Sequence, residues 1–403
     1  MSRTIENNVS LYGEGNVLDL FSGVGGLSYG IAQQSSDFTI VGAIDSDEDA
    51  VNTFNENHSS DVAVQKDLTE YTPEEFEVET GISPADVDVV CGGPPCKGFS
   101  SIRPDRADNK DDDRNYLYQF YFNFVEYFNP SVFVMENVPQ LVTHTNDSGD
   151  RIFNSVLERA ESVGYTIDHQ LLNAAHYGVP QVRTRLFLVG SVDDSVTISF
   201  PEPEFTLSSG LKMKHKDKLL ASDWTLPTER NIECVFKDLP TLEPGEEKSE
   251  YFCGPDELVR DKEQSYVEYL RSDGPSLTHH KASNNTEMMR KRLSFAGTSR
   301  SDLPEYIFPS SGYGSTYSRL RREEPSSTLT TNFTTASSTR CIHPYENRAL
   351  SLREGARIQS FPDSFDFTGT KGEVRQQIGN AVPPLLGRAI GATVVDLLNQ
   401  IEC

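Results

Sequence analysis

Cys96 is the residue of this chain best suited to nucleophilic chemistry. It lies in the segment GGPPCKGFS, residues 92–100, after an apolar run at 87–91 that predicts a buried strand. Open α/β sheets gather their reactive groups at the carboxyl ends of strands. Pro94 and Pro95 fix φ at two consecutive positions before the thiol, which favours one orientation of a reactive group. We interpret Cys96 as a presented nucleophile.

Charged side chains lie beside two further predicted strands. Glu136 follows the apolar run at 132–135, and Arg183 and Arg185 precede the apolar run at 186–189. Because strand side chains alternate between the two faces, both arginines are expected on one face of their strand. A carboxylate thus lies at the carboxyl end of a further predicted strand.

The amino-terminal part of the chain has the pattern of a nucleotide-binding α/β unit. A predicted strand at 16–21 leads into the loop SGVGG at 22–26, then into a short helix and a second strand at 38–44 before Asp45. A carboxylate about 20 residues beyond such a loop can bind ribose hydroxyls. Ser28 replaces the third glycine of a dinucleotide fingerprint, which favours an adenosine ligand without a pyrophosphate.

The composition indicates a cytoplasmic protein with a large core. The chain has 403 residues, six cysteines without a CxxC pair, no apolar leader and no long apolar run, which disfavours disulfide frameworks and membrane segments. His279 and His280 have no third ligand at metal-binding spacing. We therefore predict no metal site and expect both histidines on the polar surface.

The charge of the chain is unevenly distributed. A net charge of −25 is unfavourable for binding a polyanion, but residues 271–340 contain ten Lys plus Arg and six Asp plus Glu, and so carry +4. We expect this stretch to form a basic face. The excess of carboxylates elsewhere suggests adaptation to a cytoplasm of high salt concentration, a hypothesis that a stability titration in KCl would test.

The periodicity of the chain divides it into parts. Residues 194–344 are polar, rich in turns and weakly periodic, whereas helical periodicity returns at 348–359 and 384–399. We predict an α/β domain made of residues 1–193 and 345–403, with a smaller irregular domain inserted between them.

The order of the motifs resembles that of the C5-cytosine-specific DNA methyltransferase family. The matching segments are DLFSGVGG at 19–26, GPPC at 93–96, ENV at 136–138, QVRTR at 181–185, REGARIQSFP at 353–362 and QIGNAVP at 377–383. The resemblance implies a Rossmann-like class I methyltransferase sheet with helices on both faces, and a smaller mixed target-recognition domain at 194–344. It also implies S-adenosylmethionine as methyl donor and duplex DNA as substrate.

The resemblance assigns catalytic roles to Cys96, Glu136, Arg183 and Arg185. Cytosine C5 is a poor nucleophile, so the Cys96 thiolate would add to C6 of a cytosine flipped out of the duplex and allow C5 to attack the sulfonium methyl group. Glu136 would protonate or hydrogen-bond N3, and Arg185 would hold O2. Arg183 would position Glu136 or the neighbouring backbone. Burial is expected to raise the pKa of Glu136, because an acid must carry its proton.

The resemblance also assigns a cofactor site. Phe21 would pack on the adenine, Asp45 would bind the ribose, and the loop would contact the methionine portion through Ser22, Gly23, Val24, Gly25 and Gly26. The other expected residues are Ser46, Asp67 on the adenine amino group, Leu68, Pro94, and a returning segment of Asn380, Ala381 and Val382. Many relatives carry a bulky apolar residue where this chain has Ser46. The assignment requires the carboxyl-terminal helix to pack beside the first glycine loop.

DNA contacts are expected from the basic stretch and from the loop after the nucleophile. We predict phosphate contacts for Arg290, Lys291 and Arg292, and a contact for Ser100 within residues 97–114, which resemble the family's mobile loop. A cognate restriction endonuclease is a further partner that the resemblance suggests. We expect a monomer without a membrane partner.

Three other functions fit parts of the sequence. An RNA cytosine methyltransferase would share the chemistry, although the long insert favours duplex DNA. A catalytically silent DNA-binding module would have no need of Cys96, Glu136 and Arg185 together. A nicotinamide-dependent dehydrogenase is disfavoured by Ser28.

Overall fold

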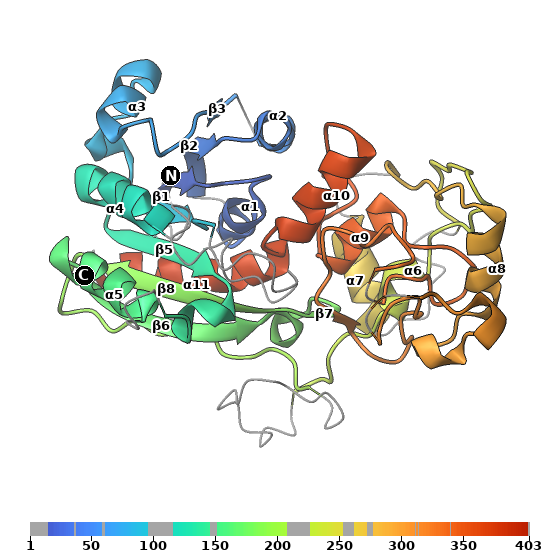
Figure 1. Ribbon diagram of the computed structural model, residues 1–403. Coiled ribbons are helices and arrows are strands. Elements are labelled where there is room, and N and C mark those ends of the chain that lie inside the picture. Colours follow the sequence, from blue (N-terminus) through green and yellow to red (C-terminus); the bar gives the residue numbers. More distant parts are fainter. Residues whose placement is uncertain are drawn as a thin grey trace, which may run out of the picture.

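A seven-stranded sheet forms the centre of the fold (Figure 1). The structure is a computed structural model and describes residues 15–35, 38–58, 61–95, 116–145, 151–207, 226–252, 262–271, 277–310, 312, 314–338 and 340–401. The strands of the sheet are β1 (Gly15–Leu20), β2 (Phe38–Asp45), β3 (Ala63–Gln65), β4 (Val89–Gly92), β5 (Val132–Asn137), β6 (Thr166–Asn173) and β8 (Thr184–Ser191). Their order is β3-β2-β1-β4-β5-β8-β6, and β8 runs antiparallel to both of its neighbours. The predicted α/β class is confirmed.

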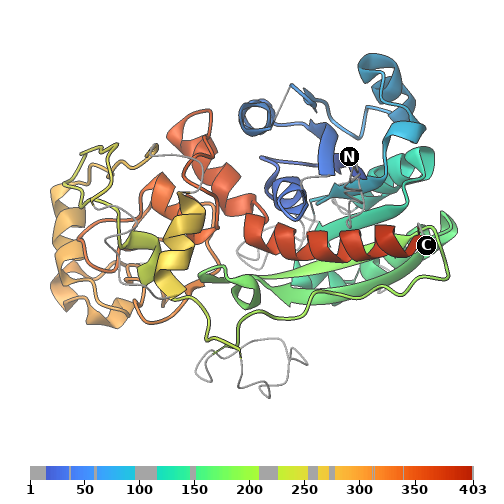
Figure 2. The same ribbon diagram turned by 180° about the vertical axis from the view of Figure 1, so that it is seen from behind.

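The central strands are mostly apolar because helices cover both faces of the sheet, and the polar exceptions include Asp19 in β1 and Glu136 in β5. The helices of the first half are α1 (Gly26–Ala32), α2 (Glu48–Asn57), α3 (Pro73–Thr80), α4 (Leu117–Phe128) and α5 (Ile152–Ser162), and the last two are α10 (Lys371–Asn380) and α11 (Pro384–Ile401). Buried side chains of α1 and α11 share one apolar cluster with the sheet, and those of α3, α4 and α5 share another. Figure 2 shows α11 lying along the sheet.

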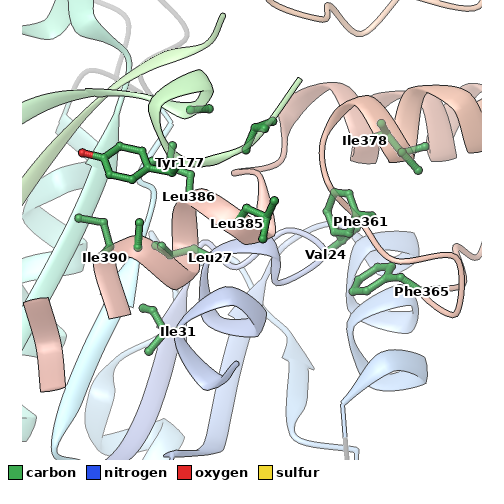
Figure 3. Close-up of a cluster of buried hydrophobic side chains, with 14 of the residues drawn as sticks. Val24, Leu27, Ile31, Tyr177, Phe361, Phe365, Ile378, Leu385, Leu386 and Ile390 are labelled. Atoms are coloured by element: carbon green, nitrogen blue, oxygen red, sulfur yellow. The ribbon is translucent and has the colours of Figure 1, made fainter. Parts of the chain in front are cut away.

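Helices α1 and α11, from opposite ends of the chain, pack at very short range. Leu27 and Leu386 belong to the same buried cluster, in which Figure 3 shows the two helices side by side. A Cβ atom added at Gly30 would lie 2.2 Å from the carbonyl oxygen of Pro384, and one at Gly387 would lie 2.7 Å from that of Leu27. The crossing therefore requires glycine on both helices.

The burial of α11 explains its composition. The stretch Lys371–Ile401 is long and apolar enough to cross a membrane, and 72% of its most apolar window is buried inside the protein. Its apolar side chains pack against α1 and the sheet. The hydrophobicity of this helix is that of a core helix.

A second group of elements lies beside the sheet (Figure 1). It contains α6 (Glu233–Phe236), α7 (Lys262–Leu270), α8 (Glu287–Phe295), α9 (Leu352–Ile358) and the short strand β9 (Ser326–Ser327), which pairs in parallel with β7 (Gln181–Val182). Helix α9 starts later than the periodicity predicts, because Ser351 caps it: its Oγ accepts from Glu354 N, and the Glu354 carboxylate accepts from Ser351 N.

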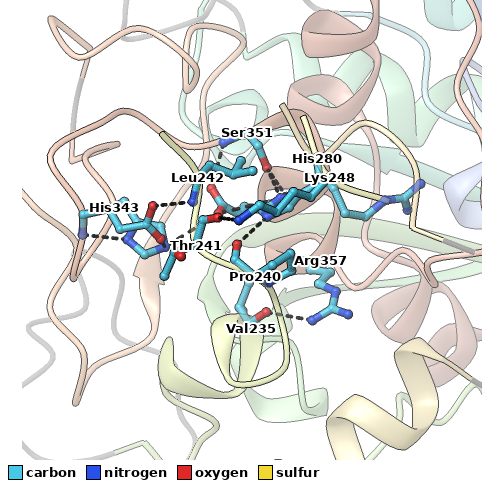
Figure 4. A network of polar contacts seen from close by, with 12 residues as sticks. Val235, Pro240, Thr241, Leu242, Lys248, His280, His343, Ser351 and Arg357 are labelled. Atoms are coloured by element: carbon cyan, nitrogen blue, oxygen red, sulfur yellow. Dashed lines mark hydrogen bonds and ion pairs between the residues drawn. The ribbon is translucent and has the colours of Figure 1, made fainter. Parts of the chain in front are cut away.

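Buried charges join α9 to the loop after α6. Arg357, whose side chain is fully buried, forms ion pairs of 2.6 Å with Asp238 and with Asp363. Figure 4 shows its further hydrogen bond to the carbonyl oxygen of Val235. His280 lies in the same region, with its ring nitrogens 3.1 Å from Ser351 Oγ and 3.0 Å from the Pro240 carbonyl oxygen. The expected surface position of His280 was wrong, because these two partners allow a polar ring to be buried.

Candidate active site

An ion pair between Glu136 and Arg185 lies where strand β5 ends and strand β8 begins. Glu136 is on β5 and Arg185 on β8, two neighbouring antiparallel strands, and Arg185 Nε lies 2.8 Å from Glu136 Oε1. Only 13% of each side chain is exposed. Burial raises the pKa of Glu136, although Arg185 and Arg183 act in the opposite direction. The pair therefore combines a carboxyl group that tends to keep its proton with a cation beside it.

The segment that leads to the nucleophile lies against this pair. A Cβ atom at Gly93 would lie 3.1 Å from Glu136 Oε2, so glycine lets the backbone approach the carboxylate. Asn137 Nδ2 donates to the carbonyl oxygen of Pro94 at 3.0 Å. Cys96 and Ser100 lie outside the described residues. The sequence analysis assigned no role to Asn137, although its position directly after Glu136, at the end of a predicted strand, could have indicated one.

Arg183 has a different environment from Arg185. It lies in the break between β7 and β8, and its buried guanidinium donates to the carbonyl oxygens of Gly379, Asn380 and Ala381 at 2.9–3.2 Å. Arg185 belongs to β8, whereas Arg183 lies between β7 and β8, and the two guanidinium groups have different partners. Arg183 binds the end of α10, and only its charge acts on Glu136.

The glycine loop after β1 is hydrogen-bonded to an acidic side chain and borders open space at Gly23. Asp45 accepts from Gly23 N at 2.8 Å and from Asp47 N at 2.9 Å, and its remaining lone pairs can accept further hydrogen bonds. A Cβ atom at Gly23 would meet nothing within 4 Å, whereas one at Gly26 would lie 2.3 Å from the Val382 carbonyl oxygen. The returning segment thus reaches the first glycine loop.

Two buried oxygen atoms, one in β1 before this loop and one in the loop, have no hydrogen-bond partner among the described residues. Neither Asp19 Oδ2 nor Ser22 Oγ has a hydrogen-bond partner among the described residues, although both atoms are buried. Unsatisfied buried oxygens beside open space are suited to the polar and cationic groups of a ligand. The loop therefore fits the methionine portion of S-adenosylmethionine.

The other residues assigned to the cofactor lie near the same edge of the sheet. Phe21 and Leu68 pack in one apolar cluster, and Phe21 has a positive φ of 53°. Asp67 is exposed and accepts from the backbone N and the hydroxyl of Thr69 at 2.9 and 2.8 Å. Ser46 is exposed. An exposed carboxylate at Asp67 remains open to an adenine amino group.

The predicted DNA contacts on α8 differ in exposure. Arg290 and Lys291 are exposed, and Lys291 Nζ lies 5.0 Å from the ring centroid of Tyr306. Arg292 is half-buried, and its Nε donates to the Ile307 carbonyl oxygen at 2.9 Å. Arg292 thus holds α8 against the following loop. Within the described ranges, no group of three or more His, Cys, Asp or Glu side chains could hold a metal ion.

Comparison with known proteins agrees with this geometry. The model of the C-5 cytosine-specific DNA methylase family matches residues 15–396. The chain belongs to this family. It is a DNA (cytosine-5)-methyltransferase, and the resemblance seen in its motifs is confirmed.

Similar proteins cover almost the whole of this methyltransferase. The type II methyltransferase M.AgeI of Thalassovita gelatinovora is 31% identical, with 94% of this chain and 98% of the relative covered. M1.HphI of Haemophilus parahaemolyticus is 32% identical, with 94% and 86% covered. Among solved structures, a prophage-encoded DNA modification methyltransferase of E. coli is 26% identical with a TM-score of 0.66, covering 96% of this chain and 100% of that one.

Proposed function

We propose that this methyltransferase moves a methyl group from S-adenosylmethionine to C5 of a cytosine flipped out of duplex DNA, through a covalent bond between Cys96 and C6. The ion pair of Glu136 and Arg185 supports this most directly, because Glu136 lies beside Gly93 in the segment that leads to Cys96 and Arg185 contacts Glu136. A protonated carboxyl and a guanidinium match the two acceptors on one edge of cytosine, N3 and O2.

The residues have distinct tasks in the reaction. The Cys96 thiolate forms a bond to C6, and the electron pair of the C5–C6 double bond moves into the ring, where the Glu136 proton at N3 and Arg185 at O2 stabilise it. The bound cofactor supplies an electrophilic methyl group, which C5 takes up while the sulfur keeps the bonding electron pair. A base then removes the C5 proton, the double bond re-forms, and Cys96 leaves as a thiolate.

The cofactor assignment rests on the shape and chemistry of the glycine loop. Gly23 borders open space, Asp45 keeps lone pairs for ribose hydroxyls, and Val382 approaches Gly26 from the end of the chain. Asp19 Oδ2 and Ser22 Oγ offer unsatisfied acceptors nearby. A pyrophosphate would place negative charge beside these carboxylates, whereas a sulfonium cofactor places positive charge there.

DNA recognition is assigned to the insert. We propose that residues 194–344 form the target-recognition domain and that residues 1–193 and 345–403 form the catalytic domain. Arg290 and Lys291 on α8 would contact phosphates. Because similar proteins are named type II methyltransferases, a cognate restriction endonuclease is a natural partner. We further propose a cytoplasmic monomer.

Methyl transfer from labelled S-adenosylmethionine, offered DNA and tRNA separately, tests the proposal. We expect label in DNA, and bisulfite sequencing of DNA from expressing cells should report the target sequence. Label in tRNA alone would overturn the DNA assignment. The variant Cys96→Ala should lose methylation and keep DNA binding, whereas turnover that survives in this variant would refute the covalent step.

A further inference from the structure

Asp19 is a buried acid that has no cationic partner among the residues that the structure describes. It lies in β1, paired in register with Cys91 of β4 and Ala43 of β2, and its side chain is 1% exposed. No described basic side chain forms an ion pair with it, and its Oδ2 atom has no hydrogen-bond partner in the described part of the chain. An ionised carboxylate in such a position costs several kcal/mol unless a counter-charge is supplied.

The groups that face Asp19 do not favour its ionised form. The Cys91 thiol on β4 and the Ser28 hydroxyl on α1 can donate to it, but Asp45 on β2 adds a like charge, and Tyr121 on α4 is neutral with its pKa raised by burial. Burial is the largest effect and raises the pKa of Asp19 to about 7, against the hydrogen bonds from Ser28 and Cys91. A substantial fraction of Asp19 is therefore protonated near neutral pH.

The position of Asp19 links this proton to the cofactor site. Asp19 lies two residues before the turn at Phe21 that leads into the glycine loop, and Ser22 Oγ in that loop is also buried without a described partner. Asp45, on the neighbouring strand, holds the same loop through Gly23 N. A positively charged group bound at the loop would thus lie near the carboxyl group of Asp19, which has no cationic partner among the described residues.

We propose that the carboxyl group of Asp19 holds a proton in the free protein and releases it when the cationic cofactor binds at the glycine loop. The inference rests on the proposed use of S-adenosylmethionine. Its positive sulfonium and ammonium groups provide a counter-charge that no described side chain supplies, so binding favours the carboxylate and a proton leaves to solvent. Cofactor affinity is then coupled to pH through a residue outside the catalytic pair.

The sign of the coupling follows from the two states of Asp19. The carboxyl group titrates near pH 7 in the free protein and at lower pH in the complex. Affinity therefore weakens as pH falls below 7, by about fivefold between pH 7 and pH 6, whereas above pH 7 the α-amino group of the cofactor begins to lose its own proton. At pH 7 binding should release about half a proton per cofactor.

Titration calorimetry of the full-length protein with S-adenosylmethionine tests the coupling without methyl transfer. The heat of binding is measured at pH 7 in phosphate and in Tris, buffers with small and large enthalpies of ionisation. We expect the heats to differ by the amount that corresponds to the released proton. Equal heats in the two buffers overturn the coupling alone, whereas a protein that binds no S-adenosylmethionine overturns the proposed cofactor and the coupling with it.

Two matched variants assign the proton to its residue. Asp19→Asn keeps the shape of the side chain and should bind the cofactor with equal heats in both buffers and with no dependence on pH between pH 6 and pH 7. Asp45→Asn is the comparison variant, because Asp45 is a half-buried acid at this loop with a raised pKa; it should bind the cofactor more weakly and still release the proton. The proposal is contradicted if cofactor binding still releases a proton in Asp19→Asn and no longer does so in Asp45→Asn. Should Asp19→Asn not fold, infrared difference spectra of the wild type decide: the band of a protonated carboxyl group must disappear on cofactor binding.

Discussion

Asn137 Nδ2 donates to the carbonyl oxygen of Pro94 at 3.0 Å and so ties the end of β5 to the segment that leads to Cys96. Asn137 directly follows Glu136, whose carboxylate lies against Gly93. One strand end therefore fixes both the Glu136 carboxylate and the backbone that leads to Cys96. In the proposed mechanism these two residues act on the same pyrimidine ring.

Loss of this contact should slow the chemical step. In Asn137→Ala the segment before Cys96 is free to shift, and a displacement of about 1 Å can cost about 10²-fold in rate. We expect the single-turnover rate of methyl transfer to fall to this extent with unchanged affinity for S-adenosylmethionine. Asn123→Ala is the matched control, because Asn123 is an exposed residue of α4 that contacts Arg159. Equal rates for Asn137→Ala and the wild type would contradict the role.

The reaction should depend on a protonated Glu136. Burial raises the pKa of this carboxyl group, so the neutral acid persists above the ordinary range of glutamate, and the rate should fall as pH rises through the shifted pKa. Glu136→Gln keeps an N–H donor that does not titrate. We expect this variant to lose about 10²–10⁴-fold in single-turnover rate and to lose this limb of the pH profile. A profile of unchanged shape in Glu136→Gln would assign the limb to another group.

Gly26→Ala should weaken cofactor binding and the fold together. The new methyl group would lie 2.3 Å from the Val382 carbonyl oxygen, so the loop and the returning segment must move apart. We expect a loss of about 1–3 kcal/mol in the free energy of unfolding and a lower cofactor affinity in calorimetry. Gly372→Ala on α10 is the control: its Cβ atom would have only Thr370 Oγ1 nearby, at 3.7 Å, and alanine favours a helix. A Gly26→Ala protein as stable as the wild type would contradict this packing.

Removal of the buried cation on α9 should destabilise the protein strongly. Arg357→Met removes the ion-pair partner of the buried Asp363 and leaves Asp238 with Arg271 at 3.3 Å, which should cost about 3–5 kcal/mol in chemical denaturation. Arg159→Met, which breaks an exposed pair with Glu126, should cost less than about 1 kcal/mol.

The pH dependence of the Arg357 effect has a definite sign. Burial opposes ionisation of Asp363, but Arg357 holds the pKa of this carboxyl below its usual range, so the stabilisation is present above that range and is lost as pH falls. The stability gap between wild type and Arg357→Met should therefore narrow in acid. A gap that widens in acid would contradict the ion-pair interpretation.

Two arginines of α8 should affect DNA binding differently. Arg290 is exposed, so Arg290→Ala should weaken binding of all DNA sequences and reduce the slope of log affinity against log salt by about 1. Arg292 holds the Ile307 carbonyl oxygen, so Arg292→Ala should mainly lower the melting temperature. An unchanged salt slope in Arg290→Ala would exclude its phosphate contact.

The sequence determined the family, the strand and helix pattern around the motifs, and the residue types of the chemistry. The strands β1, β2, β4 and β5 follow from apolar runs, and the order of the motifs identifies the fold, because both signals are local in the chain. Helices α7 and α8 carry only weak periodicity, so the insert read as irregular.

Only the tertiary structure decided which side chains meet. It directs Arg183 to the carbonyl oxygens at the end of α10 while Arg185 pairs with Glu136, and it leaves Asp19 Oδ2 without a described partner. The physical reason is that periodicity reports which face of an element is buried, whereas a hydrogen bond depends on the register and close packing of segments far apart in the chain. The pattern of residues predicted the chemistry, and the packing of α10 and α11 against the first glycine loop decided its geometry.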